Sequence, residues 1–218
     1  MAIKALKGSH KARRIPLPSE RSGWYELLPE APPAVTVTGT PTFEFAVLGA
    51  GACGLAAARR LAQLRPEESI AVVEAARVGH GTSGRNAGFM LSHHSHGGIA
   101  DISSGKRNDR LFCYGHAWLA DIVQSHQIRC DWTEWGQIYV AADTPGEHHL
   151  GLVEQGFEAL GVESARMERD ELRAVTGTEF YSSGVRVAGA SLVQPAAMMR
   201  GLGQTLPENV SVYENSPV

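Results

Sequence analysis

Three glycines at a fixed spacing mark the part of the sequence whose residue types suggest chemistry. Residues 49–54 read Gly-Ala-Gly-Ala-Cys-Gly. The first glycine allows a tight turn, the second lets a pyrophosphate approach the backbone, and the third lets a helix pack closely on a strand. The N–H groups that open the helix then face the phosphates, and the helix dipole adds attraction. The predicted pyrophosphate contacts are Gly49, Ala50, Gly51, Ala52, Cys53 and Gly54.

An acidic residue follows the glycine loop at the distance expected for a group that binds the ribose of a dinucleotide. Glu74 lies 20 residues beyond Gly54, at the end of an apolar stretch. A carboxylate there accepts hydrogen bonds from ribose hydroxyls and repels a 2′-phosphate. With 24 glycines in 218 residues, the triplet could match by chance and is weak evidence alone. The strand before it, the helix after it and Glu74 make it specific. We therefore count Glu74 and Ala75 among the cofactor-binding residues.

The residues around the loop predict the elements that hold it. Residues 43–48 and 70–74 form apolar strands, and residues 52–64 form a helix rich in Ala and Leu, which together make a parallel βαβ unit. The expected fold class is α/β. Further helices are expected at 107–127, 145–160, 170–175 and 195–206, and strands at 136–142, within 181–192 and at 210–213.

Composition and charge exclude several function classes. The net charge of −3 argues against a general role on nucleic acid or on a membrane surface. No run of eighteen apolar residues predicts a membrane span, and no apolar segment follows the basic first fourteen residues, so a signal peptide is not expected. Three cysteines cannot form a closed disulfide set, which favours a reducing, cytoplasmic location.

A second polar, glycine-rich stretch decides between the two dinucleotides that the acidic residue allows. Residues 77–90 contain four glycines together with Ser83, Arg85 and Asn86. Such a loop can offer backbone amides and polar side chains to a long ligand, whereas the corresponding half of an NAD enzyme usually continues directly into another helix. FAD is therefore favoured over NAD.

Both loops resemble one family. Residues 47–62 and 72–90 are similar to the FAD-dependent amine and D-amino-acid oxidoreductases, which include glycine, sarcosine and γ-glutamylputrescine oxidases. The element GxSGRNxGF at 81–89 is more specific than the glycine triplet, and it most resembles the γ-glutamylputrescine oxidase-like branch. Shorter similar fragments lie at 22–25, 170–172, 194–195, 200–202 and 213–218.

The resemblance implies a fold, a set of contacts and a reaction. It implies a glutathione-reductase-like FAD fold with a partial α+β substrate domain, and oxidation of a primary or secondary amine or an amino acid. Hydride would pass from the carbon next to nitrogen to flavin N5, and the imine would then hydrolyse. Val218 would meet the adenine through its backbone. The residues implied along the pyrophosphate, the ribityl chain and the flavin edge are Ser83, Arg85, Asn86, Ala87 and Gly88.

Three histidines follow this second loop, in the run Ser-His-His-Ser-His at 92–96. His93, His94 and His96 allow three interpretations: a base or orienting group beside the flavin, a metal site, or a solvated polar loop. No metal site is predicted, because no cysteine or carboxylate nearby in the sequence supplies a convincing further ligand. Trp132 and Trp135 flank the 136–142 strand, where they line an amine pocket or simply pack.

The expected organisation is an extended arm (1–42), an FAD-binding βαβ unit (43–91), a partial substrate domain (92–193) and a returning helix and strand (194–218). Trp24, Tyr25, Leu27 and Leu28 are candidate anchors for the arm. Members of the resembled family continue for about as many residues again, so we expect only the N-terminal half, with the first strand at an exposed sheet edge. A second chain could supply the rest. The alternatives to an enzyme half are a non-catalytic FAD- or nucleotide-binding fragment and, less favoured, an NAD-dependent dehydrogenase.

Overall fold

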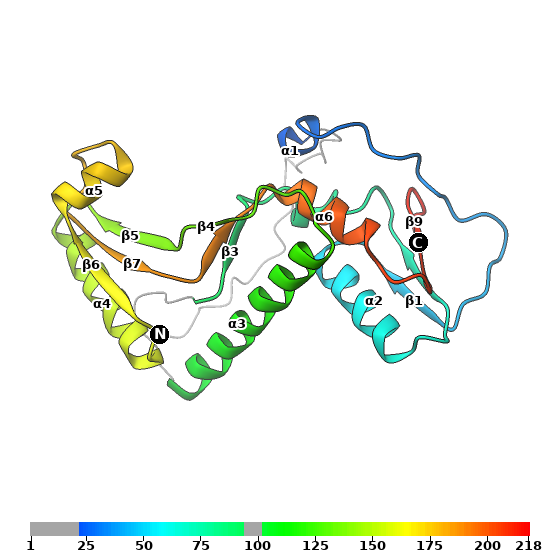
Figure 1. Ribbon diagram of the computed structural model, residues 1–218, viewed down its shortest axis with the longest axis horizontal. Helices are drawn as coiled ribbons and strands as arrows, with labels where there is room; N and C mark the ends of the chain where they lie inside the picture. Colours follow the sequence, from blue (N-terminus) through cyan, green and yellow to red (C-terminus); the bar gives the residue numbers. More distant parts are fainter. Residues whose placement is uncertain (1–21, 94–101) are drawn as a thin grey trace, which may run out of the picture.

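A computed structural model describes residues 22–93 and 102–218 of the chain. These residues form two lobes at opposite ends of an elongated molecule (Figure 1). One lobe, which we call the α2 lobe, holds a parallel sheet, and the other, the α4 lobe, holds an antiparallel sheet. Helices α3 (Ile102–Ser125) and α6 (Pro195–Gln204) lie between them, together with a small third sheet.

The α2 lobe contains the predicted βαβ unit. Its elements are β1 (Phe45–Leu48), α2 (Ala52–Leu64), β2 (Ile70–Val73) and β9 (Val210–Tyr213). The strands are parallel in the order β1-β2-β9, with Phe45 opposite Ile70 and Ile70 opposite Val210. The expected α/β class with a Rossmann-like sheet is confirmed, and β1 lies at an edge of this sheet, as the sequence predicts.

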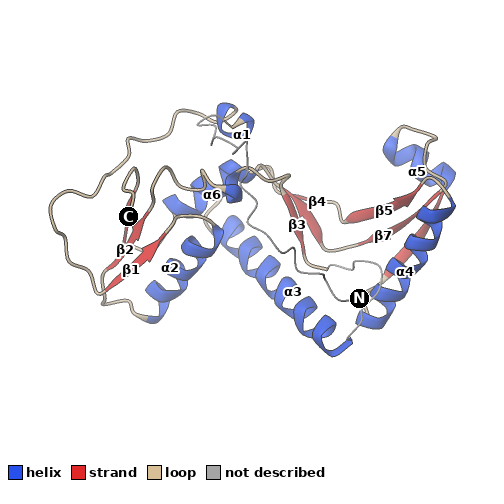
Figure 2. Ribbon diagram, turned by 180° about the vertical axis from the view of Figure 1, so that it is seen from behind, coloured by secondary structure: helices blue, strands red, loops and turns tan. Residues whose placement is uncertain are grey.

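Helix α2 forms because its residues favour a helix and its ends are marked. Alanine and leucine dominate it, and Pro66 follows its C-cap residue, Arg65, so the helix cannot continue. Its buried side chains Leu55, Ala58 and Ala62 recur at helical spacing on one face. That face packs with Ile70 and Val72 of β2 in a single apolar core (Figure 2).

The α4 lobe is antiparallel. Its elements are β5 (Gln137–Ala141), α4 (Thr144–Leu160), β6 (Ser164–Glu168), α5 (Arg169–Thr176) and β7 (Ser183–Val187). The strand order is β5-β7-β6, and α4 buries Leu150, Val153 and Phe157 against this sheet. The Asp143 carboxylate caps the start of α4 by accepting the Gly146 N–H (2.8 Å), and Gly161 ends the helix with a φ of 76°.

A third sheet connects the lobes. Strands β3 (Phe89–Leu91), β8 (Ala190–Leu192) and β4 (Thr133–Glu134) pair antiparallel in the order β3-β8-β4. Helices α3 and α6 contribute Ile122, Met198 and Met199 to the core of the α2 lobe. Among the described helices, α3 is the longest, and none has an apolar stretch of the length needed to cross a bilayer.

Most of the predicted elements are present, with shifted ends, and some were missed. The 107–127 helix begins earlier, at Ile102, and the 181–192 stretch contains two strands, β7 and β8. The sequence did not predict β3, β4, β6 or the short helix α1 (Gly23–Glu26). β4 has two residues and β3 has three, while β6 buries only Met167, so these strands carry little apolar alternation.

A buried arginine ties α2 to the end of α6. The Arg59 guanidinium donates from Nη2 to the carbonyl oxygens of Leu202 (3.3 Å) and Thr205 (2.6 Å) and to Thr205 Oγ1 (2.8 Å). The residue is 5% exposed. Carbonyl groups in the last turn of a helix lack partners within the helix, and a cation there also complements the helix dipole. Arg59 therefore closes the C-terminal end of α6.

We expect Arg59→Met to lower the free energy of unfolding by about 2–3 kcal/mol, because it keeps the aliphatic stem but leaves buried carbonyl groups without donors. Urea denaturation of the full chain measures this. The neighbouring Arg60 is exposed and donates to the exposed Gln63 side chain (3.1 Å), so Arg60→Met is the matched control. Equal effects of the two substitutions would contradict this role of Arg59.

Candidate dinucleotide and substrate site

The turn from β1 into α2 has the backbone geometry that its glycines predict. Gly49 has a φ of 95°, which favours glycine, and its N–H donates to the Val73 carbonyl (2.8 Å). Helix α2 begins directly after Gly51. A side chain at Gly54 would overlap the Gly49 carbonyl oxygen, so glycine is required for this close approach. The start of α2 is thereby held at the carboxyl edge of the sheet.

The space beside Gly51 differs from that beside Gly54. Among the described residues, a Cβ at Gly51 would meet only the Ser83 side chain, with Oγ at 3.0 Å. Ser83 Oγ accepts a hydrogen bond from the Ala52 N–H (3.0 Å), and both Ala52 and Cys53 are exposed. An oxygen atom therefore already lies against the first turn of α2, where the helix dipole favours an anion.

Glu74 lies at the carboxyl end of β2 and is bonded to the glycine loop. Its Oε2 accepts the Ala50 N–H (2.7 Å) and its Oε1 accepts the Ala76 N–H (2.9 Å). Its own backbone N–H donates to Tyr213 on β9 (2.8 Å). The carboxylate is thus held between two backbone amides at the sheet edge, next to the turn that the sequence assigns to the pyrophosphate.

The polar side chains of the second loop bond to the loop itself. Arg85 Nε donates to the His80 carbonyl (2.7 Å), Asn86 Nδ2 donates to the Ser83 carbonyl (2.7 Å), and Asn86 Oδ1 accepts the Gly88 N–H (2.8 Å). Gly88 has a φ of 80°, and any side chain there would overlap the Val193 carbonyl. These bonds fold residues 79–88 into a tight structure around the short 3₁₀ helix at Thr82–Gly84.

The two loops lie against each other. Besides the bond between Ser83 and Ala52, the Gly79 N–H donates to the Ala50 carbonyl (3.0 Å). An apolar cavity of about 560 Å³ opens beside this junction, with Ser83 and Asn86 in its lining and Trp118 and Met199 among its apolar walls. Residues about 30 positions apart in the sequence therefore form one site with a polar and an apolar part.

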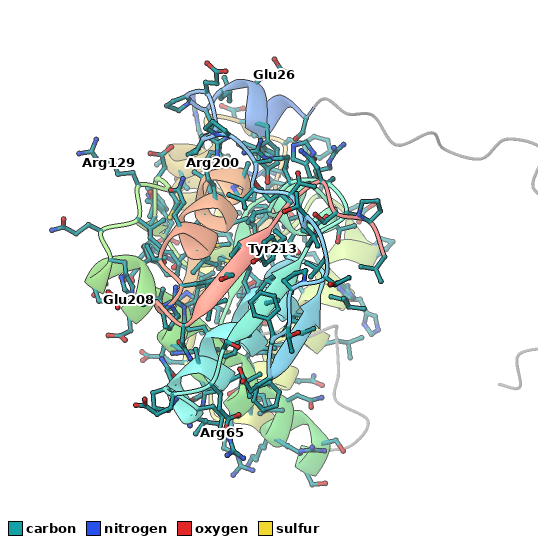
Figure 3. The ribbon with its side chains drawn as sticks, turned by 90° about the vertical axis from the view of Figure 1, so that its right-hand side faces the viewer. Glu26, Arg65, Arg129, Arg200, Glu208 and Tyr213 are labelled. Atoms are coloured by element: carbon teal, nitrogen blue, oxygen red, sulfur yellow. The ribbon has the colours of Figure 1, made fainter. Side chains whose placement is uncertain are left out.

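The C-terminal segment returns to the same edge of the sheet. Ser216 N–H donates to the Glu74 carbonyl (2.9 Å), and Ser216 Oγ accepts the Val37 N–H of the arm (2.9 Å). Figure 3 shows Tyr213 on β9, with Arg200 on α6 nearby. Val218 is 93% exposed.

A second cavity, of about 530 Å³, lies on the side of β4 and β8. Its lining includes Trp135, Glu134, Arg186, His116 and Ser191. His116 Nε2 lies 2.9 Å from Ser191 Oγ, and burial lowers the pKa of the imidazole. Trp135 therefore lines a cavity. The sequence did not single out two other lining residues, His116 and Glu134.

His93 is held in place by groups far from it in the sequence. Its Nδ1 lies 2.8 Å from Asp109 Oδ1 on α3, and its carbonyl accepts a hydrogen bond from Gln137 Nε2 (2.9 Å). Cys113 Sγ lies 3.6 Å from the same Nδ1. Burial, and then the Asp109 carboxylate, raise the pKa of the Cys113 thiol. His94 and His96 lie outside the described residues.

Comparison with known proteins identifies this architecture. Residues 44–218 match the family model described as FAD dependent oxidoreductase. The chain belongs to this family. It is 24% identical over 193 residues to the γ-glutamylputrescine oxidoreductase of Escherichia coli strain K12, a match that covers 85% of this chain and 45% of that protein.

Solved structures agree with this family fold. The glycine oxidase of Bacillus cereus matches with a TM-score of 0.62 at 16% identity, over 80% of this chain and 46% of that one. The L-α-glycerophosphate oxidase of Mycoplasma pneumoniae, solved with FAD bound, matches with a TM-score of 0.62 at 16% identity, over 81% of this chain and 45% of that one. This FAD dependent oxidoreductase chain spans less than half the length of the curated relatives that it matches.

The residues present fit the dinucleotide that the family name implies. A Cβ at Gly51 would lie beside the Ser83 side chain, in the space that a pyrophosphate would need to approach the backbone, and glycine leaves that space to it. Ser83 and the start of α2 offer hydroxyl and N–H groups to phosphate oxygens, while Glu74 offers a carboxylate to ribose. The donor set therefore suits an unphosphorylated ribose and a pyrophosphate.

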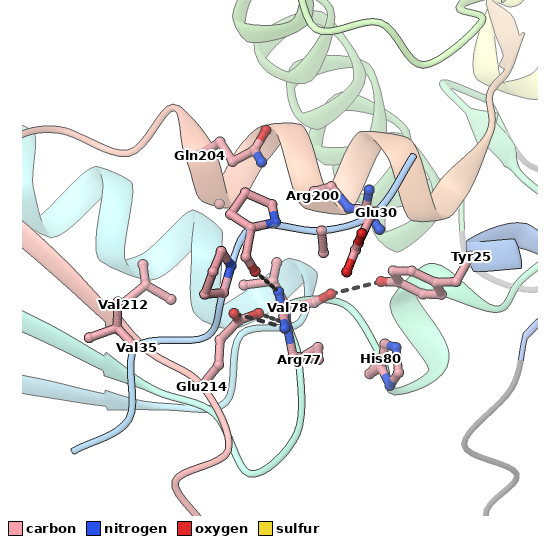
Figure 4. Close-up of a pocket in the computed structure, with 14 residues that line it drawn as sticks. Tyr25, Glu30, Val35, Arg77, Val78, His80, Arg200, Gln204, Val212 and Glu214 are labelled. Carbon is pink, nitrogen blue, oxygen red and sulfur yellow. Dashed lines mark hydrogen bonds and ion pairs between the residues drawn. The ribbon is translucent and has the colours of Figure 1, made fainter. Parts of the chain in front are cut away.

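The arm supports the second loop from behind, through a residue whose role the sequence only suggested. Tyr25, on α1, donates its hydroxyl hydrogen bond to the Val78 carbonyl (2.7 Å), as Figure 4 shows. Its hydroxyl oxygen lies 2.8 Å from where a Cβ at Gly79 would be and 2.7 Å from one at Gly84. The two glycines therefore make room for the tyrosine. Of the other expected anchors, Leu27 is 76% exposed, so its assignment was wrong.

The surroundings of Tyr25 keep it neutral. Burial raises the pKa of its hydroxyl to about 12, although the nearby Arg200 and Arg85 oppose this shift. The Arg200 guanidinium lies 5.9 Å from the centre of the tyrosine ring, and its Nη1 donates to the Pro29 carbonyl of the arm (2.6 Å). The sequence indicated this contact only by naming Tyr25 as a candidate anchor of the arm.

The second and third glycines of the first loop should respond differently to an added methyl group. We expect Gly54→Ala to lower the free energy of unfolding by roughly 3 kcal/mol, because the methyl overlaps backbone. We expect Gly51→Ala to cost less than about 1 kcal/mol, because it meets only a side chain that can rotate. Denaturant unfolding of both variants measures the difference, and similar losses would contradict this division of roles.

We expect Tyr25→Phe to lower the free energy of unfolding by about 1–2 kcal/mol at neutral pH, because the half-buried Val78 carbonyl loses its donor. Because the folded-state pKa is raised, this contribution is complete below pH 10 and is lost as the pH rises through about 12. Unfolding measured at pH 8 and at pH 11 should therefore show a smaller difference at the higher pH. Tyr114, which is exposed, supplies the control Tyr114→Phe.

Proposed function

We propose that this chain binds FAD at the junction of its two glycine loops and forms the cofactor-binding part of an amine or amino-acid oxidoreductase. The observation that carries the proposal is the meeting of Gly51, Ser83 and the start of α2 beside the carboxylate of Glu74. Bound FAD would supply an acceptor for the hydride on the carbon next to nitrogen. The imine product would then hydrolyse in water.

The chain's own residues have distinct parts in this proposal. Gly49 to Gly54 would hold the pyrophosphate, Glu74 and Ala75 the adenosine ribose, and the backbone of Val218 the adenine. The loop residues Ser83, Arg85, Asn86, Ala87 and Gly88 would lie along the pyrophosphate, the ribityl chain and the flavin edge. Arg85 and Asn86 would act mainly through the loop shape, because their side chains bond to its backbone.

The proposed substrate class is a primary or secondary amine or an amino acid. Similar proteins are named for γ-glutamylputrescine and glycine. The cavity near β4 adds physical support, because Glu134 and Trp135 offer a carboxylate and an aromatic face to a protonated amine, and Arg186 offers a cation to a carboxylate. Turnover is proposed for the chain together with the remaining part that its relatives contain, whether in the same polypeptide or from a second chain.

Titration of the purified full chain with FAD tests the cofactor. We expect saturable quenching of flavin fluorescence with one FAD per chain, and an affinity lower by roughly 10- to 100-fold in Gly51→Val, because its methyl groups enter the pyrophosphate space. Gly151→Val in α4, where a Cβ meets nothing within 4 Å, is the matched control. Unchanged FAD binding in Gly51→Val would overturn the assignment of the loop.

The acidic residue provides an independent test. We expect Glu74→Gln to weaken FAD binding by roughly 10- to 100-fold, because an amide cannot accept from two N–H groups and ribose hydroxyls as a carboxylate does. Competition with NAD⁺ should displace little FAD from the unmodified chain. Tight NAD⁺ binding without FAD binding would favour a dehydrogenase instead.

The reaction is tested separately from the cofactor. An FAD-loaded chain that loses its yellow colour with an amine or amino acid under anaerobic conditions would support the oxidoreductase. A yellow chain that no such compound bleaches would support FAD binding without catalysis by this chain. Failure of FAD binding and failure of the reaction are distinguishable, because the absorbance of bound flavin is measured before any amine is added.

A further inference from the structure

Three side chains that bind metals in other proteins converge where β3 ends. His93 follows β3 after Ser92, while Asp109 and Cys113 lie four residues apart on α3 and therefore on one face of that helix. The nearest ligand atoms, His93 Nδ1 and Asp109 Oδ1, are 2.8 Å apart. Cys113 Sγ lies 3.6 Å from Nδ1 and 3.9 Å from Asp109 Oδ2.

We propose that His93, Asp109 and Cys113 form a divalent metal site, with Zn²⁺ as the cation that their chemistry fits best. One ligand atom from each residue lies within 4.8 Å of the other two. A nitrogen, a carboxylate oxygen and a sulfur together suit a metal of intermediate softness, whereas Mg²⁺ and Ca²⁺ prefer oxygen alone. The three residues would leave a fourth tetrahedral position for water.

The separations are close to those of a zinc site. Bond lengths of about 2.0 Å to nitrogen and oxygen and about 2.3 Å to sulfur, at tetrahedral angles, place sulfur ~3.5 Å from the other two ligands and place nitrogen ~3.3 Å from oxygen. The two sulfur distances, 3.6 Å to His93 Nδ1 and 3.9 Å to Asp109 Oδ2, lie within a few tenths of an ångström of this, although the carboxylate oxygen nearest His93 is the other one, Oδ1. The His93–Asp109 pair would open by about 0.5 Å, which rotation of the Asp109 carboxylate supplies.

Backbone and side-chain contacts hold the segment that carries His93. The Ser92 N–H donates to the Gly189 carbonyl (3.1 Å), and Gln137 Nε2 donates to the His93 carbonyl (2.9 Å). Gly189 has a φ of 81°, and a Cβ there would lie 3.2 Å from His93 Cδ2. The histidine is therefore positioned by β5 and by the turn between β7 and β8, as supporting groups position metal-binding histidines generally.

Metal at this place would connect the end of β3 to α3. In the structure these elements are joined by the hydrogen bond of His93 with Asp109, and the Cys113 thiol donates to the Ser92 carbonyl (3.3 Å). A metal would replace those bonds with three coordinate bonds and would displace the thiol proton to solvent. The alternative, a hydrogen-bonded cluster that binds no metal, is one outcome of the test.

Cobalt and zinc titrations of the full chain provide the test. We expect one equivalent of Co²⁺ to produce a sulfur-to-cobalt charge-transfer band, and Zn²⁺ to abolish it by displacement. Cys113→Ser should remove the band, and Cys113→Ser and Asp109→Asn should each weaken Zn²⁺ binding by roughly 10-fold or more. Cys53→Ser should keep the cobalt band and the Zn²⁺ affinity, whatever its effect on FAD, because Cys53 is an exposed thiol outside the cluster.

Circular dichroism and unfolding of each variant without metal establish whether it is folded. If Cys113→Ser fails to fold, the nearly isosteric Asp109→Asn carries the test. The proposal would be overturned if the unmodified chain did not bind one saturable equivalent of metal. It would also be overturned if the charge-transfer band survived Cys113→Ser and disappeared in Cys53→Ser. The metal titrations are independent of FAD binding, so their failure and the failure of the proposed function are distinguishable.

Discussion

The close approach of α2 to the end of β1 is the constraint on which the rest of the α2 lobe depends. Because Gly54 has no side chain, the first turn of the helix lies directly against the Gly49 carbonyl. This contact aims the unpaired N–H groups of the helix at the carboxyl edge of the parallel sheet. The first turn of α2 therefore favours an anion, and the Glu74 carboxylate is bonded to the same loop.

The second loop gains its shape from side chains that bond inward. Arg85 and Asn86 satisfy backbone groups of their own loop, and Tyr25 fills the space that Gly79 and Gly84 leave behind it. A ligand would therefore meet a loop that is already formed, and less conformational entropy would be lost on binding. Through Tyr25 the arm belongs structurally to the cofactor site proposed for this chain.

Helix α3 has a similar connecting role between the lobes. Its C-terminal part packs Ile122 and Val123 into the core of the α2 lobe, while Asp109 and Cys113, nearer its start, meet His93 at the end of β3. Apolar packing holds one end of the helix and polar contacts hold the other. The strand that leaves the second loop is thus fixed to the same helix that packs into the α2 lobe.

Local pattern in the sequence determined the βαβ unit, the glycine turn, the acidic residue and most of the helices, because turn chemistry and hydrophobic periodicity act over a few residues. It did not predict the short strands β3 and β4, which are held by pairing with β8. Nor did it predict the neighbours of His93, since the expectation of no metal ligand considered only residues close in sequence. Asp109 and Cys113 reach that imidazole only because α3 folds back across the end of β3. Contacts of this kind join segments whose separation carries no local signal, so only the tertiary structure decided them.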